Sequence, residues 1–378
     1  MSTQTLDLSA LRRCLTLRDL SNPEEGPHAI QLLVDAIVLA LARSLAVPIE
    51  VHRQSPIVSI ADNYDRLGYA HDAVARDTLY SRYLCESALL RTHTTAMIPG
   101  LLRRQARAPE DDRILVCPGM VYRRDAIDRR HSAEPHQVDV WWISRSRRLG
   151  PNDLNQLIEL TLSAALPGRA LRTLPATHPY TEQGLEIRAR DGEEWLEVGE
   201  CGLSARALLA TQGLDPAQYS GLALGLGLDR LLMIRKQIPD IRLLRARDLR
   251  IEAQMQDLLP YRAVSAMPAV RRDLSLVLDA SDDPESLGER VRQALGSEAE
   301  VVESVEILEQ TPHDALPEAA RTRLGIAPGQ RNALVRLVLR AYERTLTSSE
   351  CNQLRDRVYQ ALHRGTRSEW ALGAPPRV

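Results

Sequence analysis

Apolar residues recur at helical spacing near the start of the chain. Within residues 28–46 they occupy Ile30, Leu33, Val34, Ile37, Leu41 and Leu45. This stripe predicts an amphipathic helix that packs on a core. Residues 47–58 follow as an extended segment, in which Pro48 and Pro56 restrict any strand to an edge or an interface.

Two apolar runs with a charged loop between them predict a hairpin. Residues 113–122 and 137–144 form the strands, and the loop carries many arginines and acids, so it is able to hold a polyanion. Further along, the pattern predicts a helix over 151–165, short strands over 195–198 and 222–226, and a helix over 229–236 directly after a glycine-rich turn.

A second domain is predicted to begin near Ser265. Its expected elements are a strand, a helix, two strands and a helix, over residues 270–278, 284–295, 301–308, 333–340 and 348–363. This order, with room for a fourth strand, is typical of a split βαβ module of ferredoxin-like fold.

Composition limits the class of protein. A chain of 378 residues predicts two or three domains, and 44% hydrophobic with 26% charged residues excludes disorder, collagen and a disulfide-rich miniprotein. No apolar run reaches 18 residues and the N-terminus lacks a signal-peptide pattern, so we expect no membrane contact. Five scattered cysteines predict a reduced, cytoplasmic chain without structural metal.

Two residue types are abnormally rare. Phe is absent, and Lys236 is the one lysine among 48 basic residues. Codon bias in a GC-rich gene accounts for the scarcity of Lys. It does not account for the absence of Phe, because ten Tyr residues remain.

Charge is uneven within the second predicted domain. Residues 279–309 carry ten acids and two Arg, whereas residues 321–367 carry ten Arg and three acids. One interpretation is a basic face that binds a polyanion such as tRNA. The other is a solvated, arginine-rich surface without a ligand.

Two local motifs suggest phosphate and nucleotide chemistry. Residues 121–125 read VYRRD, where Arg123 can contact a phosphate in bidentate fashion and Asp125 could accept from an adenine amino group. His131 in the following loop could meet outer phosphates. Residues 225–230 read GLGLDR, a glycine-rich turn that opens a helix and is neither a P-loop nor a Rossmann fingerprint.

These motifs belong to a longer ordered series. In chain order it reads SPIV (55–58), NYD (63–65), LRTHTT (90–95), VYRRD (121–125), HQVD (136–139), WLEV (195–198), GLGLDR (225–230), IPDIR (238–242), MPAVRRD (267–273) and ERTLT (343–347). The series resembles single-chain phenylalanyl-tRNA synthetase of the mitochondrial type, from about residue 55 to about residue 365.

The resemblance implies an α+β protein. A helical segment over 1–50 would precede a class II synthetase catalytic domain with an antiparallel sheet over 51–262, and a ferredoxin-like anticodon-binding domain would span 263–378. It also implies ATP-dependent activation of an amino acid as the aminoacyl-adenylate, transfer to tRNA, and a monomeric enzyme.

The resemblance further implies an ATP site. Its residues would be Arg123, Asp125, His131, Pro135, Glu197 and Arg230. In catalysis Arg123 would grip the α-phosphate, His131 the outer phosphates, and Arg230 would stack on adenine. Mg²⁺ is expected with the ATP near Glu197, because this cation prefers oxygen ligands.

An amino-acid site is implied as well. Its residues would be His93, Thr95, Gln137, Asp139, His178, Tyr180, Glu200 and Ala223. Gln137 and Asp139 would bind the α-ammonium, with Asp139 in place of the family's usual Glu. His93 and Thr95 would lie by the ammonium and carboxylate, and Thr95 stands where Ser is common.

The predicted ring pocket departs from the family pattern. Residues 178–180 read HPY where the family has Phe-Pro-Phe, Glu200 is added, and Leu224 and Pro135 replace phenylalanines. Because buried polar groups need partners, these side chains either pair with one another or meet a polar substrate. The substrate is thus phenylalanine or a polar relative. An alternative function is a paralogue that activates an amino acid for a biosynthetic or regulatory purpose.

Overall fold

The computed structural model describes residues 5–264, 267–342 and 344–367 and divides into two compact units. The first unit comprises Met1–Arg123, Glu134–Leu244 and Glu252–Tyr261, and the second comprises the rest. Ser265, the expected start of the second domain, and Glu343 of the last motif lie outside the described residues. Every helix within the described part is too short or too polar to cross a membrane.

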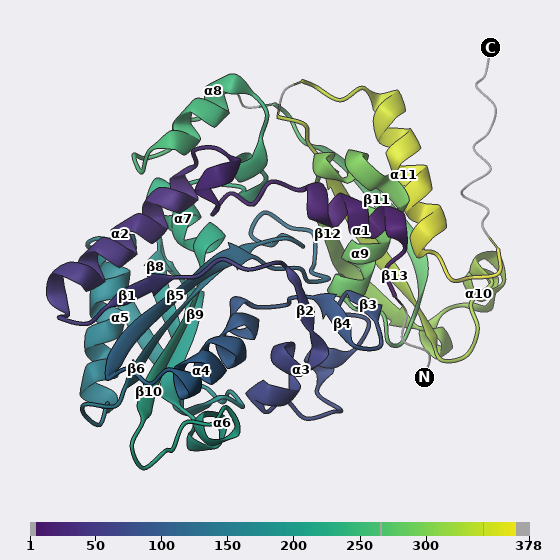
Figure 1. Cartoon of the computed structure of the whole chain (residues 1–378). Helices are drawn as coiled ribbons and strands as arrows, with labels where there is room; N and C mark the ends of the chain where they lie inside the picture. The colour runs from purple at the N-terminus through teal and green to yellow at the C-terminus, as the bar shows by residue number, and fades with distance from the viewer. Residues whose placement is uncertain (1–4, 265–266, 343, 368–378) are drawn as a thin grey trace. The chain divides into compact units, whose positions relative to one another are not determined.

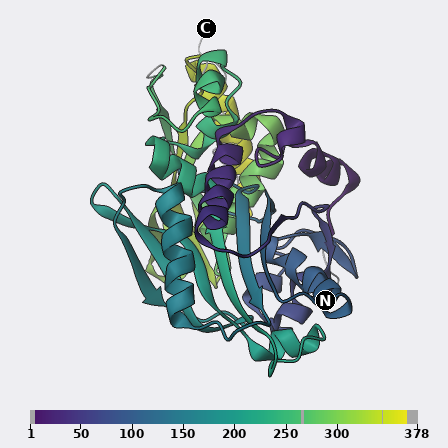
Figure 2. The same cartoon turned by 60° about the vertical axis from the view of Figure 1, so that its left-hand side comes forward.

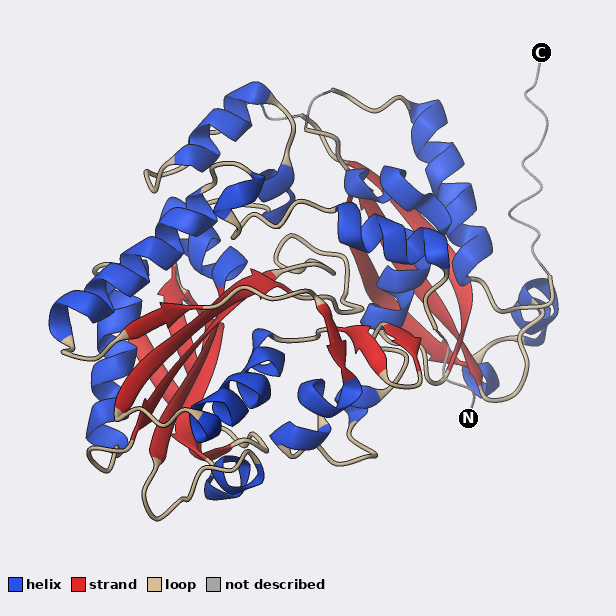
Figure 3. Ribbon diagram, viewed as in Figure 1, coloured by secondary structure: helices blue, strands red, loops and turns tan. Residues whose placement is uncertain are grey.

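A seven-stranded sheet forms the centre of the first unit (Figures 1 and 3). Its strands are β1 (Ile49–Val51), β5 (Asp112–Met120), β6 (His136–Ser144), β7 (Leu171–Pro175), β8 (Thr181–Asp191), β9 (Glu194–Ser204) and β10 (Ser220–Gly227). They lie in the order β1-β5-β6-β10-β9-β8-β7. β1 pairs with β5 in parallel and all other pairs are antiparallel, which confirms the predicted antiparallel sheet and its hairpin. β1 is an edge strand, as the prolines beside it predicted.

Helices cover both faces of this sheet (Figures 1 and 2). On one face α2 (Ala29–Ser44) packs against α5 (Pro151–Ala165) and α7 (Leu228–Lys236). On the other face α4 (Ile98–Arg107) contributes to a core that includes Trp141 and Ile143 of β6. Side chains alternate between the faces of a strand, so Asp139 of β6 projects to the same face as α4.

Residues 5–50 belong to the first unit. α1 (Leu8–Thr16) places Cys14 in a small apolar cluster with Leu90, Met120 and Tyr122.

A second, small sheet has the order β2-β4-β3, with β2 (Ile57–Ser59), β3 (Tyr83–Cys85) and β4 (Ala88–Leu90). The remaining short helices are α3 (Ile60–Asn63), α6 (Arg206–Thr211) and α8 (Leu249–Glu252).

The second unit contains the predicted strand, helix, two strands and helix. They are β11 (Val270–Asp279), α9 (Pro284–Leu295), β12 (Val302–Pro312), β13 (Gln330–Leu339) and α11 (Ser348–Leu362), with the short α10 (Glu318–Leu324) between β12 and β13. The antiparallel order β11-β13-β12 is that of a ferredoxin-like sheet. Leucine and valine side chains of β11 and β13 pack against both long helices in one core.

Among the described residues, the place left for a fourth strand beside β11 is not filled by a strand. Two residues after α11 reach β11: His363 Nδ1 accepts from Val277 N at 3.1 Å, and Arg364 N donates to Val277 O at 2.8 Å. Thr366 N then donates to Gly325 O at 3.0 Å. The chain therefore turns toward the end of α10 instead of continuing along the edge of β11.

Residues 124–133, within the predicted charged loop, cluster with the second unit, which the expected boundary at 262/263 did not include. Arg292 Nη2 donates to the carbonyl oxygen of Ala126 at 3.0 Å, and Val305 N donates to that of Ile127 at 3.0 Å. A Cβ on Gly288 would lie 2.7 Å from the carbonyl oxygen of Asp125, so this close approach requires glycine. Ile127 itself joins the core of this unit.

The single lysine is a structural residue of the first unit. The Lys236 side chain is 1% exposed, and Nζ donates to Asp257 O, Asp257 Oδ1 and Leu259 O at 2.9, 2.7 and 2.7 Å. An ammonium supplies three donors from one point, which matches this set of acceptors.

Candidate active site

Asp139 is a buried carboxylate in the middle of the large sheet. It is 3% exposed, and it accepts from Thr94 Oγ1 at 2.5 Å and from Trp141 Nε1 at 3.0 Å. Burial raises its pKa, although these hydrogen bonds oppose the shift. No cationic side chain among the described residues forms an ion pair with Asp139. Its negative charge is therefore balanced by neutral donors only.

The turn that carries Thr94 lies beside the same strand. Thr94 N donates to Gln137 Oε1 at 3.4 Å, which brings Gln137 next to the Asp139 cluster. Thr95, which is 3% exposed, also interacts electrostatically with the Asp139 carboxylate and opposes the rise of its pKa. The His93 ring stacks on Tyr69 with 5.7 Å between centroids. Burial, aided by the charge of Arg123, lowers the pKa of His93 to about 3, so its ring is neutral at pH 7.

Aromatic rings extend from this cluster. The ring of Tyr180 lies 6.3 Å from that of Tyr69, 6.2 Å from that of Trp141 and 5.9 Å from that of His178. Ala223 of β10 is the register partner of Trp141 and is 2% exposed. The residues predicted to surround a substrate ring thus lie on one face of the sheet.

The unusual polar residues of this region pair with one another. His178 Nε2 lies 2.9 Å from Glu200 Oε2, and His178 Nδ1 lies 3.3 Å from Thr181 Oγ1. The hydroxyl of Tyr180 interacts electrostatically with Thr95. Of the two sequence-based alternatives, this geometry favours internal pairing over a requirement for a polar substrate.

Two arginines lie near one acid at the edge of this region. Arg230 Nη1 donates to the backbone oxygen of Glu197 at 2.7 Å. The exposed Glu197 carboxylate interacts electrostatically with both Arg230 and Arg123. Arg123 also acts on Tyr69 and His93, and its buried Nε has no hydrogen-bond partner in the described part of the chain. Arg123 is therefore a cation between the Asp139 cluster and Arg230 without a fixed anionic partner.

Not all predicted ATP-site residues belong to this unit. Pro135 does, and its carbonyl oxygen accepts from Val121 N at 2.8 Å. Asp125 and His131 belong to the second unit, where Asp125 Oδ1 accepts from Ala126 N at 2.9 Å and His131 Nδ1 lies 2.6 Å from Asp128 Oδ2. Their part in an ATP site stays a prediction.

Three residues of the site were missed in the sequence. Thr94 stands between His93 and Thr95 and was passed over, although it makes the shortest contact to Asp139. Trp141 follows Asp139 by two positions, so the two-residue period of a strand could have placed both on one face. Tyr69 carries no local signal, because only the folded chain brings it to His93.

The family described as "tRNA synthetases class II core domain (F)" matches residues 29–255. The chain belongs to this class II synthetase family. The predicted resemblance to phenylalanyl-tRNA synthetases is thereby confirmed at the level of the core and its sheet.

Named synthetases are similar over different lengths. The phenylalanine–tRNA ligase alpha subunit of Prochlorococcus marinus (strain MIT 9313) is 39% identical over 192 residues, 51% of this chain and 56% of the relative. That of Nostoc sp. (strain PCC 7120) is 30% identical over 257 residues, 67% of this chain and 72% of the relative. The chloroplastic/mitochondrial phenylalanine–tRNA ligase of Arabidopsis thaliana is 28% identical over 317 residues, 80% of this chain and 68% of the relative. The synthetase-like chain thus spans little more than half the length of the first relative.

Proposed function

We propose that this chain activates phenylalanine with ATP and transfers the acyl group to tRNA. The observation that carries the proposal is the buried Asp139 carboxylate, balanced by neutral donors and set within a class II synthetase core. An ammonium group would supply the positive charge that balances this carboxylate. The alternative of a paralogue with a biosynthetic or regulatory role is not favoured, because the similar proteins are named phenylalanine–tRNA ligases.

On the amino-acid side, Asp139 and Gln137 bind the α-ammonium, and neutral His93 with Thr95 lies by the carboxylate. Tyr180, His178, Glu200 and Ala223 surround the ring. Phenylalanine is the proposed substrate because His178 and Glu200 already satisfy one another at 2.9 Å. A polar ring would have to compete with that pair for its hydrogen bonds.

On the ATP side, a carboxylate oxygen of the amino acid attacks the α-phosphorus, and pyrophosphate leaves with its electron pair. Arg123 stabilises the negative charge that develops on the α-phosphate, because its guanidinium is a permanent cation whose buried Nε has no hydrogen-bond partner among the described residues. Arg230 stacks on adenine while its own Nη1 is held by Glu197 O. Pro135 is a further proposed nucleotide contact within the first unit.

Mg²⁺ is proposed to arrive with ATP and not as a resident ion. The described residues contain no group of three His, Cys, Asp or Glu side chains that could hold a metal by themselves. A single exposed carboxylate such as Glu197 fits Mg²⁺, which is commonly held by one or two carboxylates, phosphates and water. When bound, the ion neutralises phosphate charge.

The second unit is proposed to bind tRNA. The arginine surplus of residues 321–367 is partly neutralised within the unit, since Arg336 pairs with Asp273 at 2.8 Å and Arg344 with Glu350 at 2.8 Å. Binding would therefore be salt-sensitive and of modest strength for this unit alone. A monomeric state and a cytoplasmic location, both expected from the sequence, remain parts of the proposal.

The test is ATP–pyrophosphate exchange over a panel of amino acids, followed by acylation of total tRNA by the full-length protein. We expect the strongest exchange with phenylalanine, and loss of exchange in Arg123→Ala. Exchange without tRNA acylation would support the paralogue instead. Stronger exchange with tyrosine or another polar ring would contradict phenylalanine as the substrate.

A further inference from the structure

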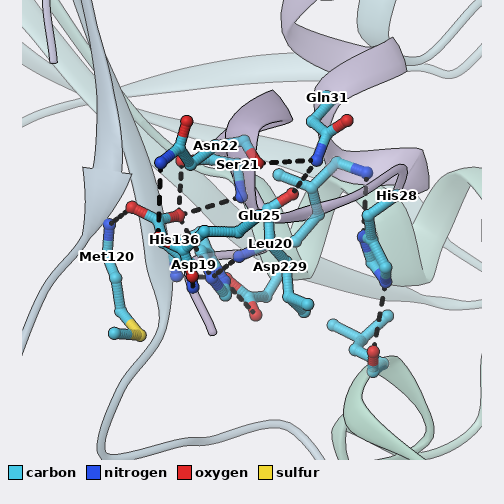
Figure 4. Close-up of polar contacts among 12 residues, drawn as sticks. Asp19, Leu20, Ser21, Asn22, Glu25, His28, Gln31, Met120, His136 and Asp229 are labelled. Carbon is cyan, nitrogen blue, oxygen red and sulfur yellow. Dashed lines mark hydrogen bonds and ion pairs between the residues drawn. The ribbon is translucent and has the colours of Figure 1, made fainter. Parts of the chain in front are cut away.

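A short turn near the N-terminus contacts the strand end that leads to Arg123. Asp19, Leu20, Ser21 and Asn22 form this N-terminal turn (Figure 4). Asp19 Oδ2 accepts from Met120 N at 3.3 Å, at the last residue of β5. Arg123 follows three residues later, so the turn fixes the chain just before it.

The same turn contacts the first residue of β6. Leu20 N donates to His136 Nε2 at 3.1 Å, and Asp19 Oδ1 lies 3.7 Å from that nitrogen. The His136 ring is thus in contact with both the backbone and the side chain of the turn. His136 is fully buried and directly precedes Gln137.

His136 also contacts helix α7 through Asp229. His136 Nδ1 lies 3.1 Å from Asp229 Oδ1, and His136 N donates to Asp229 Oδ2. Asp229 directly precedes Arg230. A chain of hydrogen bonds thus runs from the N-terminal turn through β6 to the first turn of α7 (Figure 4).

The N-terminal turn is itself rigidly held. Asp19 Oδ1 accepts from Ser21 N at 2.9 Å and from Ser21 Oγ at 2.7 Å. Gln31 of α2 donates through Nε2 to the carbonyl oxygens of Leu20, Asn22 and Gly26 at 3.2, 3.1 and 2.7 Å. The turn is therefore anchored on a core helix and can act as a fixed support.

From these contacts we propose that the N-terminal turn positions the three chain segments that carry Arg123, Gln137 and Arg230. Asp19 and His136 are positioning residues that touch no substrate. The inference rests on the proposed function, in which these three residues contact ATP and the amino acid. It assigns a role in catalysis to a part of the chain for which sequence motifs suggested none.

The test compares Asp19→Asn with Glu25→Gln. Asparagine keeps the size of Asp19 but puts an N–H donor where one oxygen accepts, so it opposes either Met120 N or the Ser21 donors. Glu25 Oε2 accepts from Asp19 N at 2.8 Å, and among the described residues Glu25 forms no hydrogen bond or ion pair with β5, β6 or α7, which makes Glu25→Gln a matched control for the turn.

We expect kcat for ATP–pyrophosphate exchange to fall about tenfold in Asp19→Asn, with KM for phenylalanine within about twofold of the wild-type value. Asp19→Glu should restore part of kcat, and Glu25→Gln should retain it. Equal kcat in Asp19→Asn and wild type would overturn the proposal. So would equal losses of kcat and melting temperature in Asp19→Asn and Glu25→Gln, since that result indicates general destabilisation.

A second measurement separates this inference from the proposed function. If the wild-type protein catalyses ATP–pyrophosphate exchange with no amino acid, the proposed function fails. Backbone hydrogen exchange then tests by itself whether the N-terminal turn positions the three segments. Faster exchange at residues 136–139 and 228–230 in Asp19→Asn than in Glu25→Gln supports positioning. Unchanged protection at both segments refutes it.

Discussion

Two carboxylates of the candidate site have opposite surroundings. Asp139 is 3% exposed and accepts from a hydroxyl and an indole, without a cationic partner among the described residues. The Glu200 side chain is 43% exposed and lies 2.9 Å from His178. One acid carries a charge that the protein leaves available, and the other has a partner within the protein.

These different surroundings indicate different roles for the two carboxylates, one in binding the substrate and one in pairing with a neighbouring side chain. A buried charge with neutral donors is costly for the fold and becomes favourable only when a cation arrives. A half-exposed acid beside a histidine is nearly neutral in energy. Asp139 therefore suits recognition of an ammonium group, whereas Glu200 serves mainly to satisfy the histidine that stands where the family has phenylalanine.

The largest expected effect follows from removing the charge of Asp139. Asp139→Asn keeps the shape and can still accept from Trp141, but it loses the attraction for the α-ammonium. We expect kcat/KM for phenylalanine in ATP–pyrophosphate exchange to fall about 100-fold, equivalent to about 3 kcal/mol for a charged hydrogen bond. The control is the affinity for ATP, which should stay close to that of the wild type. An unchanged kcat/KM would remove Asp139 from the ammonium site.

The same substitution should have the opposite effect on stability. Burial raises the pKa of Asp139, so the folded state holds the proton more tightly than the unfolded state does. The resulting stabilisation is complete below the unfolded pKa near 3.8 and is lost as pH rises through the folded pKa. At pH 7 we therefore expect Asp139→Asn to raise the free energy of unfolding.

Urea unfolding of wild type and Asp139→Asn across a pH series from 4 to 7 measures this difference. The advantage of the variant should grow with pH and vanish toward the acid end. A variant that is less stable than the wild type at pH 7 would show that the hydrogen bonds to Thr94 and Trp141 outweigh the cost of the buried charge.

Much of the fold could be predicted from periodicity. The run of apolar residues in β5 and β6 and the stripe of α5 are strong signals, and α5 spans the predicted range, Pro151–Ala165. β7 and β8 were missed because β7 is mostly exposed and β8 has only two buried side chains, so no regular alternation of apolar residues marks them. β7 pairs with β8, and β8 pairs with β9, through backbone hydrogen bonds that leave little trace in composition.

The candidate site was predictable as a set of residues but not as a set of contacts. Motifs named Asp139, His178 and Glu200, yet nothing local decides that His178 meets Glu200 from an adjacent strand. Residues 124–133 show the same limit, because their packing with α9 and β12 depends on contacts more than 150 residues away in the chain. Sequence order thus identifies the groups, and tertiary packing decides their partners.

The smallest expected effect on kcat/KM is that of replacing Glu200, the carboxylate that already has a partner. Glu200→Gln keeps an acceptor for His178 and removes only a charge that is 43% exposed, so the pair should lose less than about 1 kcal/mol. We expect kcat/KM for phenylalanine to change by less than about fivefold, and the ratio of phenylalanine to tyrosine exchange to change no more. A loss comparable to that of Asp139→Asn would mean that Glu200 contacts the substrate directly, and the two carboxylates would then share the work of recognition.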